Sequence, residues 1–138
     1  MPTATLTLTS ADIAGDPVNV SKTSTCYKAG TTTPLEETAG LNKIILTTTT
    51  NKELYIATAA GNDKAAKMYI CNKSAVPSEY VTITINAQDI GKLYAGDWMF
   101  IPWSQTDTSA QIEIQASVAT SMPIEYMLMH EGYDLADA

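Results

Sequence analysis

The 138-residue chain is predicted to be all-β, forming a single jelly-roll-like β-sandwich of about eight antiparallel strands. Apolar and polar residues alternate at period two in many segments, whereas the spacing typical of amphipathic helices is nearly absent. Twenty residues are Thr, a β-branched residue that suits a solvated strand face. Turn residues separate the alternating segments at intervals of roughly eight to twelve residues, which is typical of sandwiches and barrels.

The first forty or so residues are the least regular part of the chain. From Thr3 to Thr9, Ala and Leu alternate with Thr, which places Leu6 and Leu8 on one face of a strand. Gly and Pro then interrupt the pattern, so only short strands are expected at 17–20 and 23–28. We divide the chain into a Thr-rich N-terminal arm with edge strands (1–41), a β-sandwich core (42–131) and a short acidic C-terminal tail (132–138).

The core segment is predicted to hold the remaining strands in regular succession. They are expected at 43–49, 53–59, 66–72, 79–86, 97–103, 110–118 and 123–130, with a turn at 61–63 and a polar connection over 87–96. Ile112 and Ile114 alternate with Gln111, Glu113 and Gln115. One face of that strand is therefore expected to be buried and the other to meet water.

Two of the late strands carry apolar residues on both faces. In 97–103, Trp98 and Phe100 share one face, and Met99, Ile101 and Trp103 share the other. In 123–130, the row of Ile124, Tyr126 and Leu128 lies opposite the row of Met127 and Met129. One face of each strand can meet the core, and the second face needs a cover, which a loop, a second sheet or another subunit can provide.

We expect a subunit interface at these strands, with the N-terminal strand as an arm, although a well-covered monomer is the alternative. The expected interface residues are Leu6, Leu8, Trp98, Phe100, Trp103, Tyr126, Met127 and Met129.

Charge and hydropathy exclude several classes of partner. The formal net charge is −7 and the chain has no Arg, so direct binding of nucleic acid through neutralised phosphates is not expected. No apolar run approaches the roughly 20 residues of a membrane helix. The segment from Met1 to Ser10 has neither the basic nor the apolar block of a signal peptide, so we expect synthesis in the cytoplasm.

The residues that carry chemistry do not form a catalytic or metal-binding pattern. His130 is the single histidine, and no Gly-x-Ser-x-Gly motif supplies a nucleophile for it. The carboxylates are scattered, and Cys26 and Cys71 have no zinc-like spacing. We therefore expect no enzyme activity, no metal and no cofactor. The sequence leaves open whether the two cysteines pair.

Four phrases in the second half of the chain resemble small virion proteins of tailed bacteriophages that act as decoration or cement subunits of the head. The phrases are residues 66–74 (AKMYICNKS), 79–83 (EYVTI), 93–102 (LYAGDWMFIP) and 124–128 (IEYML), within a region of similar texture from about residue 53 to residue 131. The similarity lies in the types of residue in these phrases and in the order of the phrases along the chain. It includes no diagnostic motif, and residues 1–40 have no counterpart in it.

The resemblance implies a non-enzymatic virion protein, assembled in the host cytoplasm. Together with the two-faced strands, it leads us to expect a homo-oligomer, a trimer, that adheres to the capsid. The implied partners are further copies of the chain and the major capsid protein or other virion proteins. The alternative is a receptor- or glycan-binding module of a phage tail or fibre, in which Trp98, Trp103 and exposed Tyr residues line a shallow groove.

Overall fold

The structure, a computed structural model, describes residues 1–12, 15, 17–57, 64–105, 109–131 and 136–137. The regular elements of this part of the chain are all β-strands, paired antiparallel, so the all-β prediction is confirmed. The strand count was underestimated, because eleven strands are assigned among these residues, the last of only two residues. Within the same ranges there is no helix long and apolar enough to cross a membrane.

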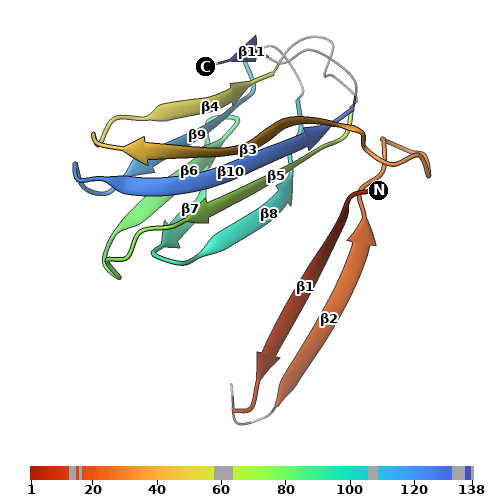
Figure 1. The fold of residues 1–138 in the computed structure, drawn as a ribbon, viewed down its shortest axis with the longest axis horizontal. Coiled ribbons are helices and arrows are strands. Elements are labelled where there is room, and N and C mark those ends of the chain that lie inside the picture. Colours follow the sequence, from red (N-terminus) through yellow and green to blue (C-terminus); the bar gives the residue numbers. More distant parts are fainter. Residues whose placement is uncertain (13–14, 16, 58–63, 106–108, 132–135, 138) are drawn as a thin grey trace.

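The strands form three sheets (Figure 1). A two-stranded sheet pairs β1 (Thr3–Ser10) with β2 (Val18–Thr25). A four-stranded sheet has the order β3 (Glu37–Leu46), β10 (Met122–His130), β5 (Ala66–Asn72) and β8 (Trp98–Pro102). A five-stranded sheet has the order β11 (Ala136–Asp137), β4 (Lys52–Ile56), β9 (Gln111–Ala116), β6 (Tyr80–Ile85) and β7 (Gln88–Tyr94).

The four- and five-stranded sheets form two layers that share one hydrophobic core (Figure 1). Ile112 and Ile114 of β9 are fully buried, as their alternation predicts. From the other sheet, Met68 of β5 and Ile124 and Leu128 of β10 reach the same core. In β6 and β9 alternate residues are buried. The apolar area removed from water in this core is the main stabilising contribution of this part of the molecule.

The segment 87–96, predicted to be a polar connection, is instead mostly strand β7. Asn86 and Ala87 have φ values of 51° and 66°, and the left-handed pair forms a tight hairpin turn between β6 and β7. Only Leu93 of β7 is buried. Because β7 is an exposed edge strand, its sequence shows no apolar period, and the pattern did not reveal it.

The N-terminal third also differs from the prediction. β2 is one continuous strand from Val18 to Thr25, and β3 begins at Glu37, so the four-stranded sheet extends past the expected boundary at residue 41. In the expected tail, β11 pairs with Ile56 and Tyr55. The predicted turn at 61–63 and residues 132–135 lie outside the described residues. Cys26 and Cys71 are both buried, free thiols.

Candidate interaction surface

The four-stranded sheet has one face toward the core and an opposite face, which we name the outer face. Its side chains form cross-strand rows because residues opposite each other in the register point the same way. The three rows contain Phe100, Tyr69, Met127 and Leu41; Trp98, Cys71, Glu125 and Lys43; and Pro102, Lys67, Met129 and Thr38. The first of these rows is apolar or aromatic across all four strands.

Large apolar side chains on the outer face are exposed to solvent. Trp98 is 52% exposed, Leu41 is 59% exposed and Ile45, which neighbours Pro123 at one end of the face, is 62% exposed. Phe100 is partly buried. The prediction that β8 has apolar residues on both faces agrees with the register, because Met99 and Ile101 pack against the core while Trp98 and Phe100 lie outside. An apolar surface of this kind is typical of an interaction site.

The ionisable groups in the middle of the outer face are held by partners. The Tyr69 hydroxyl donates a hydrogen bond to Glu125 over 3.0 Å, and Lys43 Nζ lies 4.0 Å from the same carboxylate. Burial raises the pKa of Tyr69, and its contacts with Cys71 and Glu125 raise the pKa further. Tyr69 is therefore a neutral phenol at physiological pH, and the centre of the face carries little unbalanced charge.

The β1–β2 hairpin, residues 3–25, is named the arm; it projects away from the two larger sheets (Figure 1). Its cross-strand register gives it two different faces. One face is made of Thr, Ser and Asn, and Thr5 and Thr23 share a hydrogen bond of 2.9 Å there. The other face carries Leu6, Leu8 and Val20. A two-stranded hairpin is marginally stable in isolation, so an uncovered apolar face is an unusual feature of the arm.

A groove of about 530 Å³ separates the arm from the outer face. Leu6 and Lys22, which share the apolar face of the arm, line one wall. Trp98, Phe100 and Met129 of the outer face line the other wall. A second hollow of about 490 Å³ also includes Met129 and continues toward the base of the arm. Thr3 and Thr5 from the polar face of the arm also line the groove, whereas Leu8 and Val20 are not among its lining residues. Leu6 is thus the large apolar side chain that the arm contributes to this open groove.

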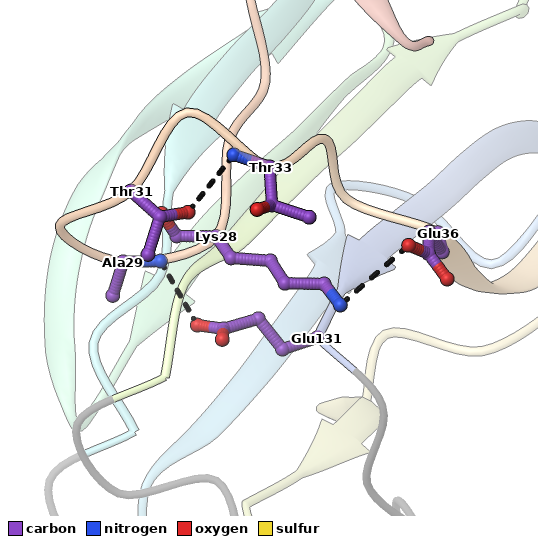
Figure 2. A network of polar contacts seen from close by, with 6 residues as sticks. All are labelled: Lys28, Ala29, Thr31, Thr33, Glu36 and Glu131. Carbon is purple, nitrogen blue, oxygen red and sulfur yellow. Dashed lines mark hydrogen bonds and ion pairs between the residues drawn. The ribbon is translucent and has the colours of Figure 1, made fainter.

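The loop at the base of the arm is fixed to the body by Glu131, which follows β10 (Figure 2). The Ala29 N–H donates to Glu131 Oε2 over 3.1 Å, and the Ala65 N–H donates to the same atom over 2.6 Å. Burial acts to raise the pKa of Glu131, but these hydrogen bonds, together with Lys64 and Lys28, outweigh it and hold the pKa below its ordinary value. The ionised carboxylate therefore anchors residues 28–36 to the end of β10.

The same loop is closed on itself by short-range contacts. Lys28 pairs with Glu36 across 3.6 Å, and the Thr33 N–H donates to Thr31 Oγ1 (Figure 2). Nearby, Cys26 donates its N–H to the Pro2 carbonyl and accepts a hydrogen bond from Leu35. The arm is therefore attached through an ordered base.

The predicted interface residues fall into three groups. Trp98, Phe100, Met127 and Met129 lie together on the outer face, and Leu6 and Leu8 lie on the arm, where they are 45% and 55% exposed. Trp103 and Tyr126 are on the core side of the sheet.

Trp103 is a core residue, only 2% exposed, and its indole N–H donates to Asn86 Oδ1 over 3.1 Å. Tyr126 packs against the core with its ring 5.9 Å from that of Tyr55, edge to face. Trp103 is therefore part of the molecule's interior, and Tyr126 is partly buried on the core side of the sheet, so neither shares the outer face with Trp98.

Sequence reasoning missed Leu41, Ile45 and Val20 as members of the exposed apolar surfaces, and it missed Glu131 as the anchor of the arm. The alternation of Leu41, Lys43 and Ile45 was available as a signal, but the expected strand began only at Lys43. The role of Glu131 depends on two backbone N–H groups from distant segments, for which the sequence carries no signal.

No group of three or more His, Cys, Asp or Glu side chains is arranged to hold a metal ion in the described ranges. His130 is only 5% exposed, and its Nδ1 lies 2.6 Å from the Glu131 carbonyl oxygen. Comparison of the chain with protein-family models, curated proteins and solved structures found no significant match.

Proposed function

We propose that the chain is a non-enzymatic structural subunit of a bacteriophage particle, a jelly-roll-like β-sandwich that self-associates as a trimer and decorates the capsid. The virion role is supported by the resemblance of the phrases in residues 66–102 and 124–128 to decoration and cement proteins. Self-association is supported by one observation above all. β8 and β10 place apolar residues both in the core and on the outer face, where Trp98 is half exposed.

Such a subunit acts by binding energy alone. A protein that binds an assembled shell but not its separate components stabilises the shell by mass action, in proportion to the logarithm of its concentration over its Kd. No residue has to perform chemistry for this function, so the proposal needs no catalytic constellation.

The test uses heads prepared without the protein. Adding the purified chain to these heads is expected to raise their thermal disruption temperature and to leave the chain bound after sedimentation. Unchanged disruption temperature together with no co-sedimentation would remove the decoration role. The matched variant is Trp98→Lys. If the isolated variant has the same thermal stability as the wild-type chain, this exposed substitution has left the fold intact.

The groove beside Trp98 favours one alternative, a receptor- or glycan-binding module of a phage tail or fibre. Trp98, Phe100 and Tyr69 line its wall, and aromatic rings with exposed faces bind sugar rings by stacking. A glycan array distinguishes the two proposals. Binding that is lost on Trp98→Ala favours the module, and an array without hits favours the decoration role.

A further inference from the structure

The arm and the outer face each lack a cover, and the molecule presents both at once. Leu6 and Leu8 on the arm, and Trp98 and Leu41 on the outer face, are all about half exposed. The polar face of the arm, with Thr5 and Thr23, needs no cover. The apolar face of the arm can therefore be covered by one apolar surface, and the outer face can be covered by one apolar occupant.

Each chain leaves its own groove open. The base of the arm is held by the hydrogen bonds of Ala29 and Ala65 to Glu131. In this position Leu6 and Trp98 line the same space of about 530 Å³. A space of this size accommodates a few aliphatic side chains but not a folded partner. The occupant that matches it is a narrow element that presents a row of aliphatic residues.

We infer that the occupant is the arm of a second copy: each chain inserts Leu8 and its apolar neighbours against the outer face of the next chain and receives the arm of another. This inference rests on the self-association in the proposed function, but it does not depend on the virion role.

The distribution of charge favours a second copy as the partner. The chain has a formal net charge of −7, so most of its surface repels another copy. The arm strands are an exception, since Lys22 is the single charged residue in β1 and β2. On the outer face, Glu125 is offset by Lys43, and Lys67 adds a positive charge. Asp12 and Asp16 are in the sequence between the two strands of the arm, but the strands themselves and the outer face carry few charges. Two acidic chains can therefore approach through these surfaces with little electrostatic cost.

The size of the arm requires more than one such contact for each chain. Each arm strand has eight residues, which corresponds to a ribbon roughly 26 Å long. One such ribbon covers a small area beside the roughly 1,000 Å² that a stable interface buries. A closed ring gives every chain two of these contacts, one as donor and one as acceptor, and leaves no arm unpaired.

The first test compares two charges on neighbouring residues of one strand. Leu8→Lys places a charge on the apolar face of the arm, and Thr7→Lys places the same charge on the polar face. Sedimentation equilibrium is expected to show self-association weakened at least about tenfold for Leu8→Lys and nearly unchanged for Thr7→Lys. Equal effects of the two substitutions would overturn the inference, and circular dichroism of both variants checks the fold.

The second test identifies the two surfaces directly. Chains with Lys22→Cys on the arm are mixed with chains carrying Lys67→Cys on the outer face, so a disulfide between the new residues can form only between copies. Mild oxidation is expected to give the mixed cross-link, whereas Lys52→Cys on β4 of the other sheet is the matched control and is expected to give none. Cys26 and Cys71 are buried in every chain, so the introduced cysteines are expected to account for the cross-links. A yield from Lys52→Cys equal to that from Lys67→Cys would overturn the inference.

The decoration role and the arm exchange can be refuted independently of each other. If wild-type chains associate through the arm but stabilise no heads, the arm exchange stands and the decoration role is lost. If Leu8→Lys leaves the oligomer and the stabilisation of heads unchanged, the decoration role stands and the arm exchange is lost.

Discussion

Ala87 adopts a backbone conformation that Gly accommodates better. Its φ is 66° in the hairpin turn between β6 and β7, and its side chain is exposed, so replacement by Gly sacrifices no packing. Relief of left-handed strain exceeds the added entropy of the unfolded chain, and Ala87→Gly is expected to raise the free energy of unfolding by about 0.5 to 1 kcal/mol. Urea denaturation measures the change, and a loss of stability would contradict this reading of the turn.

The preceding residue, Asn86, provides the matched control in the same turn. It also has positive φ, but its side chain accepts the indole N–H of Trp103 and donates to the Ser104 carbonyl over 2.7 Å. Asn86→Gly keeps the favourable backbone and leaves the buried indole N–H without its partner. We expect it to lower the free energy of unfolding by about 1 to 2 kcal/mol, the opposite sign to Ala87→Gly.

Glu131 makes the stability of the base of the arm depend on pH. Its pKa is lowered in the folded chain, so its contribution is present above the ordinary value of 4.5 and is lost as the pH falls through the lowered value. Glu131→Gln is therefore expected to destabilise the protein at neutral pH, with a difference from wild type that shrinks below about pH 4.5. Thermal denaturation across pH measures this difference.

Glu36→Gln serves as the control for the Glu131 experiment. Glu36 pairs with Lys28 in the same loop, but its side chain is 64% exposed. An exposed ion pair contributes little, so this variant is expected to follow the wild-type profile to within about 0.5 kcal/mol. A parallel loss in both variants would mean that Glu131 acts only through the general charge of the loop.

At the scale of the element, the two faces of β10 have different environments. Leu128 is fully buried in the core, and the neighbouring Met127 lies on the outer face. Leu128→Ala is expected to cost about 2 to 5 kcal/mol of unfolding free energy, whereas Met127→Ala costs less than about 1 kcal/mol under dilute conditions. Chemical denaturation of both variants at low protein concentration makes the comparison, and equal losses would place Met127 in the core.

The elements could be predicted from the sequence wherever one strand face is buried. The alternation of Ile112 and Ile114 predicted β9 correctly, because burial imposes the period on the residues. In β7 only Leu93 is buried, so no period existed to be recognised. For the two-faced strand β8, the sequence showed the two rows but not which row lies inside, and for that reason Trp103 was predicted at the interface although it is in the core.

At the scale of the whole molecule, the two Trp residues report separately on the interior and on the outer face. Trp98 is half exposed and Trp103 is buried, so quenching of fluorescence by acrylamide in the single chain comes from Trp98. If the outer face is covered on association, quenching of the wild type is expected to decrease as protein concentration rises. The Trp98→Phe variant retains Trp103 as its only Trp and is expected to show weak quenching at every protein concentration. If quenching of the wild type does not depend on protein concentration, the outer face is not covered on association.

The route by which the arm joins the body determines how the molecule carries mechanical load. The chain leaves the arm through residues 26–36 and enters β3, an edge strand whose ladder to β10 runs from Glu37 to Leu46. A pull directed along β3 acts at right angles to these interstrand hydrogen bonds and loads them together, which resists rupture better than opening them one at a time. Tension applied through the arm would thus load the whole β3–β10 ladder before it could separate these two strands.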